Sequence, residues 1–185
     1  MILEFLAPGF EEIEALAPVD ILRRAGLDIR TAAITGGGTV VSGAHSIPVT
    51  ADLTEEEALA LAETEKIEMI ILPGGMPGAA NLDASATVQF FLDKAVAEGA
   101  YIASICAAPM IPGKRGLLKG RRATCYPGFE QYLDGAEYTA GRVETDGKMI
   151  TSCGMGAAVE FGLALTAILK GEPAAENIAS AVFAK

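Results

Sequence analysis

The chain has 185 residues, a length that fits one domain with a buried core. Its net charge of −10 and isoelectric point near 4.6 argue against a nucleic-acid-binding surface, which needs a basic patch. Three cysteines and one histidine make a disulfide framework and a histidine-based metal site poor hypotheses, and we expect no cofactor. No apolar run reaches the ~18 residues that cross a bilayer, and the acidic N-terminal segment does not look like a signal peptide, so we expect no membrane contact and a cytoplasmic protein.

Short apolar runs alternate with helical patterns along the chain. A buried strand is predicted at 2–6, a helix at 11–25, a second strand at 29–34, and a hairpin with arms at 39–42 and 46–50. The apolar run 67–72 predicts a strand that ends in a glycine turn. Ser85 and Gly99 are expected to begin and end the next helix.

A strand at 101–105 follows, and then a partly helical segment at 107–118. The remaining elements are a strand at 149–152, an apolar helix at 155–169 and a last helix near 173–183. Strands that alternate with helices predict an α/β fold, with a mostly parallel sheet covered on both faces, in a single domain spanning residues 1–185. Functional residues of such folds lie just beyond the carboxyl ends of the strands.

Cys106 stands between a predicted strand and the helical segment after it. A helix N-terminus favours a thiolate, and the small Ala107 and Ala108 permit the sharp turn of a nucleophile elbow. The alternative is a buried, inert cysteine. Cys125 and Cys153 lack an evident activating partner, and we interpret both as small core or near-surface thiols.

Glu14 lies on the apolar arc of the first helix, together with Phe10, Ala17 and Ile21. An unpaired carboxylate is costly there, and burial would raise its pKa and make it a proton donor. Because the first helical turn follows the first strand, Glu14 is expected at the same sheet edge as Cys106. The alternative is a first-turn glutamate that the helix dipole stabilises.

The glycine pair Gly74–Gly75 and the segment 154–156 end at that edge as well. A backbone N–H of Gly75 is a candidate oxyanion donor, although a plain glycine turn explains the pair equally well. The sole histidine, His45, falls in the hairpin and is interpreted as an exposed residue. The basic residues between 114 and 122 are interpreted as a solvated helix end.

Five segments carry a resemblance to a known family, and they occur in order over nearly the whole chain. They are LAPGFEEIEALAPVDILRRAG (6–26), ILPGGMPGAANL (71–82), SICAAP (104–109), ATCYPGFE (123–130) and TSCGMGAAVEFGLAL (151–165). The sequence resembles the ThiJ/PfpI superfamily, in the branch of DJ-one and its bacterial relatives. The resemblance implies a flavodoxin-like three-layer sandwich, usually in a homodimer.

The resemblance also implies roles for individual residues. Cys106 is the reactive nucleophile, Glu14 is a protonated carboxyl that holds its sulfur, and Gly75 and Ala107 supply backbone donors. Gly74, Tyr126 and Gly154 are expected to line the pocket. Two departures from the family stand out. Tyr126 occupies a position where relatives often have histidine, and Pro112–Gly113 should interrupt the helix after the elbow.

The leading functional hypothesis is a cofactor-independent enzyme of glyoxalase or deglycase type that acts on 2-oxoaldehydes or early glycation adducts through Cys106. The alternative is an oxidative-stress sensor or chaperone that works through oxidation of Cys106. A structural dimer with an inert thiol is the third hypothesis.

Overall fold

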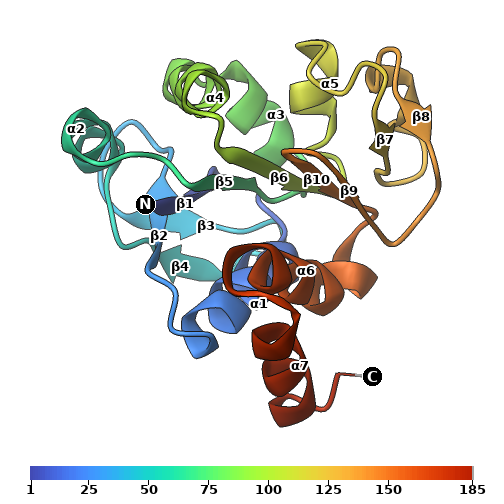
Figure 1. Ribbon diagram of the computed structural model, residues 1–185. Coiled ribbons are helices and arrows are strands. Elements are labelled where there is room, and N and C mark those ends of the chain that lie inside the picture. The colour runs from blue at the N-terminus through green and yellow to red at the C-terminus, as the bar shows by residue number, and fades with distance from the viewer. Residues whose placement is uncertain (185) are drawn as a thin grey trace.

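A six-stranded sheet forms the middle layer of the computed structural model, which describes residues 1–184 (Figure 1). Its strand order is β2-β1-β5-β6-β10-β9, and the first five strands run parallel. The edge strand β9 is antiparallel to β10. The bounds of these strands are Ile2–Leu6 (β1), Ile29–Ala33 (β2), Met69–Leu72 (β5), Tyr101–Ile105 (β6), Val143–Asp146 (β9) and Met149–Ser152 (β10). Every residue of β1 and β5 is buried, as expected of parallel strands covered on both faces.

Helices cover both faces of this sheet (Figure 1). On one face α1 and α6 pack against a cluster that contains Ile71, Ile105 and Phe161, and α7 packs on α6. On the other face α2, α3, α4 and α5 close a second cluster around Phe5 and Leu72. The bounds are Glu12–Arg24 (α1), Glu55–Thr64 (α2), Gly78–Ala84 (α3), Ala86–Glu98 (α4), Met110–Lys114 (α5), Ala158–Lys170 (α6) and Glu172–Ala181 (α7). The predicted three-layer α/β sandwich is confirmed.

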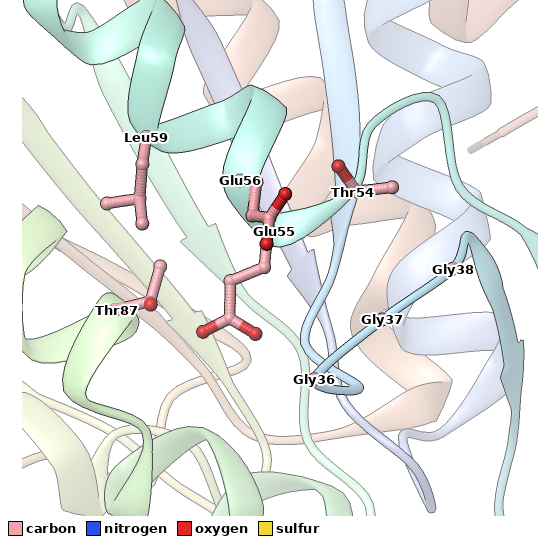
Figure 2. A pocket seen from close by; sticks show the side chains of 8 residues that line it. All are labelled: Gly36, Gly37, Gly38, Thr54, Glu55, Glu56, Leu59 and Thr87. Atoms are coloured by element: carbon pink, nitrogen blue, oxygen red, sulfur yellow. The ribbon is translucent and has the colours of Figure 1, made fainter.

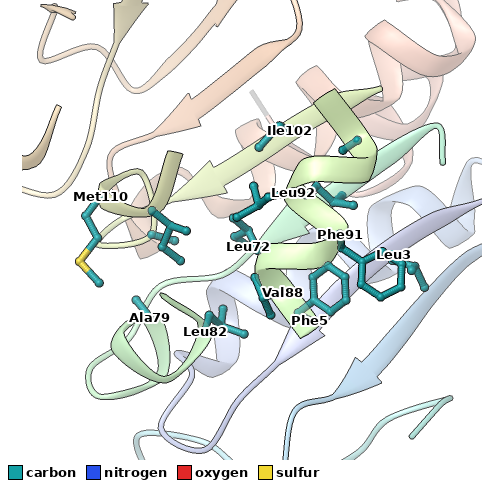
Figure 3. Packing of buried hydrophobic residues seen from close by; sticks show 14 of the residues in the cluster. Leu3, Phe5, Leu72, Ala79, Leu82, Val88, Phe91, Leu92, Ile102 and Met110 are labelled. Carbon is teal, nitrogen blue, oxygen red and sulfur yellow. The ribbon is translucent and has the colours of Figure 1, made fainter. Parts of the chain in front are cut away.

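Helix α4 shows how sequence signals produce this packing. The Ser85 hydroxyl accepts a hydrogen bond from the N–H of Val88 and begins the helix, and Gly99 ends it in the left-handed region at φ 67°. Figure 3 shows Val88, Phe91 and Leu92 directed at the sheet, where the rings of Phe5 and Phe91 lie 5.0 Å apart. Burial of a large apolar side chain of this kind stabilises the fold by roughly 1.5–3 kcal/mol.

Most predicted elements are present, and the hairpin is β3 (Val40–Ser42) with β4 (Pro48–Thr50). The helix predicted at 155–169 instead begins as a 3-10 turn, Met155–Ala157, which leads into α6. The prediction omitted α2, α3, β9, the 3-10 turn Glu130–Tyr132, and the small sheet of β7 (Arg122–Ala123) and β8 (Glu137–Tyr138). Within residues 1–184, every helix is too short or too polar to cross a bilayer.

The helical segment predicted at 107–118 is much shorter than expected, because only Met110–Lys114 forms α5. Pro112 and Gly113 lie inside this short helix and are buried. A Cβ on Gly113 would stand 2.2 Å from the Tyr132 carbonyl oxygen. The glycine therefore lets α5 pack directly against the backbone of the 3-10 turn that contains Tyr132.

Candidate active site

Cys106 directly follows β6 and has a backbone φ of 64°, in the left-handed region that non-glycine residues rarely adopt. Two hydrogen bonds hold this conformation. The Cys106 N–H donates to the Ser152 carbonyl at 2.8 Å, and the Cys106 carbonyl accepts from the N–H of Tyr126 at 2.8 Å. Strain of this kind is typical of functional sites, where the surrounding structure maintains it. The predicted elbow is therefore present at the carboxyl end of a central strand.

The expected activation of the thiol by a helix N-terminus is wrong. Residues 106–109 form turns, and α5 begins only at Met110 and has 5 residues. Individual backbone groups replace the helix, because the N–H groups of Gly75 and Ala107 hydrogen-bond the Cys106 sulfur and act to lower its pKa. The structure thus places both predicted backbone donors at the sulfur.

Glu14 projects from the first turn of α1 toward Cys106, and it is 1% exposed. The Glu11 carboxylate caps this helix by accepting the N–H of Glu14 at 2.7 Å. Burial raises the pKa of Glu14 to about 7, the hydrogen bond with Cys106 lowers it, and the charge of Glu11 raises it. The predicted position of Glu14, inside an apolar face and beside Cys106, agrees with the structure.

A negative charge on Glu14 disfavours a negative charge on Cys106. Burial raises the pKa of the Cys106 thiol, and the Glu14 carboxylate raises it further, both by its charge and by accepting a hydrogen bond. Two anions side by side in a buried place are costly. The arrangement therefore keeps at least one proton on the Cys106–Glu14 pair at neutral pH, and Glu14 releases its own proton only at about pH 7.

Glycines permit this close approach. A Cβ on Gly74 would stand 2.4 Å from Glu14 Oε2 and 2.6 Å from Cys106 Cβ. Gly75 has a φ of 84°, and its Cβ would stand 2.3 Å from the Glu11 nitrogen. Glycine is thus required at both positions, because a side chain would meet neighbouring atoms and because Gly75 has a positive φ. The sequence pattern alone did not distinguish this pair from a plain glycine turn.

One oxygen of Glu14 has no partner. Oε2 is buried, and among residues 1–184 no group forms a hydrogen bond with it. A buried polar atom without a partner costs roughly 1–3 kcal/mol. A small polar ligand, or an oxygen added to the Cys106 sulfur, would satisfy this atom, so it marks a place where chemistry can occur.

A cavity of about 470 Å³ lies near the pair, although neither Cys106 nor Glu14 is one of its lining residues. It is lined by Tyr126 and Gly154, as predicted, and a Cβ on Gly154 would stand 3.7 Å from Glu14 Oε1. Gly74 contacts the pair instead and does not line this cavity. Cys125 and Cys153 also line it, which the sequence patterns did not indicate. Tyr126 is 51% exposed.

His45 lies in the turn of the hairpin and bonds to Glu12, not to the Cys106–Glu14 pair. Its ring is exposed, but Nδ1 lies 2.7 Å from Glu12 Oε2, and its backbone N–H donates to Glu12 Oε1 at 2.8 Å. These bonds dock the hairpin on the start of α1, the helix that carries Glu14. Ligand atoms of Glu11, Glu12 and His45 lie within 4.8 Å of one another, but the Glu12 carboxylate already accepts both bonds from His45.

Another cavity, of about 310 Å³, lies near the start of α2, and its lining residues include no cysteine (Figure 2). Gly36 to Gly38 form one wall, and Figure 2 shows the Glu55 side chain extended across the opening toward Thr87. None of the residues at the Cys106 elbow line it.

The basic residues between 114 and 122 do not form a free cationic patch. Lys114, Arg115, Arg121 and Arg122 each form an ion pair, with Asp83, Asp93, Asp146 and Glu144 respectively. This pairing agrees with the interpretation that the segment is a solvated surface.

An α/β sandwich with a strained cysteine after a central strand and a buried acid on the first helix defines a class of cysteine-elbow proteins. The chain belongs to the DJ-1/PfpI family, whose pattern matches residues 1–168. It is 34% identical to Protein dj-1beta of Drosophila melanogaster over 179 residues, which are 96% of this chain and 93% of that protein.

Two further relatives bear on function. A deglycase of Pyrococcus abyssi is 32% identical over 149 residues, which are 79% of this chain and 85% of the relative. The structure of oxidized DJ-1 from Toxoplasma gondii superposes with a TM-score of 0.89 at 34% identity, covering 98% of this chain and 97% of that one. The resemblance found in the sequence is confirmed.

Proposed function

We propose that this protein is a cofactor-independent enzyme that uses Cys106 to convert small 2-oxoaldehydes or early glycation adducts. One observation carries the proposal: a buried acid with a pKa of about 7 shares a hydrogen bond with the elbow cysteine and keeps an unpartnered oxygen. General acid–base groups are most effective when their pKa lies near the working pH.

The first step forms a carbon–sulfur bond. The Glu14 carboxylate accepts the thiol proton while the Cys106 sulfur bonds to the aldehyde carbon, so no free thiolate has to persist beside the carboxylate. The aldehyde oxygen gains negative charge as its π bond breaks. The N–H groups of Gly75 and Ala107, which lie at the sulfur, are the donors closest to this charge.

The second step moves a proton between neighbouring carbons. In the hemithioacetal of a 2-oxoaldehyde, Glu14 removes the proton from the former aldehyde carbon and returns one to the adjacent carbon, which yields a thioester of a 2-hydroxy acid. Water then adds to the thioester carbonyl, the carbon–sulfur bond breaks, and the hydroxy acid leaves while the sulfur regains its proton. With a glycation adduct, the released group is the amine.

The Pyrococcus abyssi relative, which is named a deglycase, supports this class of reaction. The cavity of about 470 Å³ is large enough for a small substrate and lies next to Gly154, whose surroundings include Glu14 Oε1.

Lactate formation from methylglyoxal tests the proposal. We expect Cys106→Ala to abolish turnover and Glu14→Gln to reduce it by about 10²-fold or more, because each removes a group that takes part in bond formation or proton transfer. Glu56→Gln, which alters a carboxylate in the remote cavity, is the matched control and should leave turnover unchanged. Equal rates for wild type and Cys106→Ala would exclude the enzyme.

A second candidate function is oxidative-stress sensing through the same Cys106–Glu14 pair. An oxygen added to the Cys106 sulfur could accept a hydrogen bond from protonated Glu14, whose Oε2 lacks a partner. The oxidized state of the Toxoplasma gondii relative supports this candidate. Two measurements distinguish the candidates: the intact mass after treatment with mild peroxide, and the turnover of an aldehyde. A sensor gains oxygen on Cys106 and does not turn over the aldehyde.

A homodimer in the cytoplasm is part of the proposal. Exposed apolar side chains on α1 and at the start of α6, including Ile13, Leu16 and Val159, offer a face for a second copy. Light scattering after gel filtration tests the dimer, and a monomeric mass would exclude it.

A further inference from the structure

All three cysteines meet at the backbone of the elbow. The Cys106 N–H donates to the carbonyl just before Cys153, and the Cys106 carbonyl accepts from the N–H just after Cys125. Cys125 and Cys153 also line the same cavity. The proposed reaction uses only Cys106, so the other two thiols need an explanation of their own.

The printed register of β6 and β10 ends one residue before Cys106 and Cys153. In the parallel pair of β6 and β10, Ile105 pairs with Ser152, and the bond from Cys106 N–H to Ser152 carbonyl continues the ladder by one step. Neighbouring strands lie about 4.8 Å apart. Disulfides join residues whose Cα atoms lie about 4.4–6.8 Å apart, so this step of the ladder is a suitable site for one.

Accessibility separates the two neighbouring thiols. Cys106 and Cys153 are both partly exposed, whereas Cys125 is fully buried. Burial and the charge of Glu130 raise the pKa of Cys125 to about 12, which keeps it an unreactive thiol. The Cys106 sulfur faces Glu14 and Gly75, and Cys153 lines the cavity, so a disulfide requires the two side chains to move toward each other.

We propose that Cys153 is the resolving thiol of Cys106, and that the pair reduces hydroperoxides by forming an intramolecular disulfide. This activity rests on the reactivity of Cys106 that the proposed function requires, and it adds a second substrate class.

The chemistry takes place in two balanced steps. The Cys106 sulfur attacks the distal oxygen of a hydroperoxide, the O–O bond breaks, and an alcohol or water leaves as Cys106 becomes a sulfenic acid. The Cys153 thiol then attacks the Cys106 sulfur, the S–S bond forms, the S–O bond breaks, and water leaves with the thiol proton. One hydroperoxide is reduced and two thiols are oxidised. A dithiol reductant restores the starting state.

Cys153 would also protect the elbow. A sulfenic acid without a resolving thiol proceeds to sulfinic acid with a second hydroperoxide, and that product is stable to ordinary thiol reductants. Formation of the disulfide prevents this further oxidation of Cys106 to sulfinic acid.

The experiment uses the full-length reduced protein, one equivalent of hydrogen peroxide, alkylation of the remaining thiols, and mass analysis before and after digestion without reductant. Cys125→Ser is the matched control for Cys153→Ser, because both replace a cavity-lining thiol by a hydroxyl. Circular dichroism confirms that each variant is folded.

We expect wild type and Cys125→Ser to lose two hydrogens and to yield a peptide pair joined through Cys106 and Cys153. Cys153→Ser should lose this disulfide completely and gain oxygen on Cys106 instead. A disulfide that survives in Cys153→Ser, or oxygen gain without a disulfide in wild type, would overturn the assignment while leaving Cys106 reactive. If Cys106 is unchanged in every variant, both the role of Cys153 and the sensing function are contradicted. The lactate assay with methylglyoxal then tests the proposed enzyme independently.

Discussion

Replacing Glu14 by glutamine should change how stability depends on pH. The Glu14 carboxyl is buried, and its pKa rises from 4.5 to about 7 on folding. Between these values the unfolded chain has released the proton while the folded protein keeps it. The free energy of unfolding of the wild type therefore falls as pH rises through this window, and it levels off above the folded pKa. Glutamine has no proton to release, so the variant lacks this decline.

The size of the effect follows from the shift. Each pKa unit corresponds to about 1.4 kcal/mol, and most of the window lies between about pH 5 and about pH 8, which gives a relative loss of about 2.5 kcal/mol for the wild type across that range. The charge of other groups affects both proteins alike and cancels in the difference.

Urea unfolding of both proteins at several pH values measures this difference. The stability of wild type minus that of Glu14→Gln should decline steadily with pH and then become constant. Parallel stability curves over the whole range would refute the conclusion that Glu14 keeps its proton on burial. A constant offset between the curves is irrelevant, because it reports only the packing of the amide.

Three further changes test the packing and the buried charges. Glu4 is fully buried in β1, burial raises its pKa, and within residues 1–184 neither of its carboxyl oxygens has a hydrogen-bond partner. Glu4→Met should therefore raise the free energy of unfolding by about 1–3 kcal/mol at neutral pH, with less gain in acid, where the wild-type carboxyl is neutral in both states. A less stable variant at neutral pH would contradict this. Gly74→Ala forces a methyl group against Glu14 and Cys106 and should cost about 1–3 kcal/mol in urea unfolding, an expectation that an unchanged midpoint would rule out. Gly113→Ala should lower the melting temperature, because the new Cβ would meet the Tyr132 carbonyl oxygen. Gly156→Ala is the control: its Cβ would meet no atom within 4 Å, so stability should change by no more than about 0.5 kcal/mol. Equal melting temperatures for the two variants would show that the approach of Gly113 to Tyr132 is unimportant.

Strands with continuous apolar runs were predictable because parallel strands are buried on both faces, as β1 and β5 are. The helix α2 was not, since it buries only Ala58 and Ala62 and lacks a broad apolar stripe. Its Thr54–Glu57 capping box was the signal that could have found it. The edge strand β9 is equally inconspicuous, because its residues are only partly buried or exposed and it is defined by pairing with β10.

At the site, Cys106 and Glu14 were predictable from local patterns: a strand end followed by small residues, and a carboxylate on an apolar arc. The convergence of Cys125 and Cys153 on the elbow was not, because it depends on the register of β10 and on a loop that returns to bond the Cys106 carbonyl. The expected interruption of the helix at Pro112–Gly113 is wrong, because both residues lie inside α5. The effect of this short helix on the electrostatics of Cys106 was not predictable either, because it depends on the observed start at Met110.

The shared proton of Cys106 and Glu14 is tested most directly by the pH dependence of Cys106 alkylation. The measurement uses protein in which Cys125→Ser and Cys153→Ser leave one thiol, with and without Glu14→Gln, and follows the rate with iodoacetamide. We predict that the rate profile with Glu14 present changes slope at about pH 7, where Glu14 titrates, and that this change disappears with glutamine. Superimposable profiles would show that the two side chains do not share a proton.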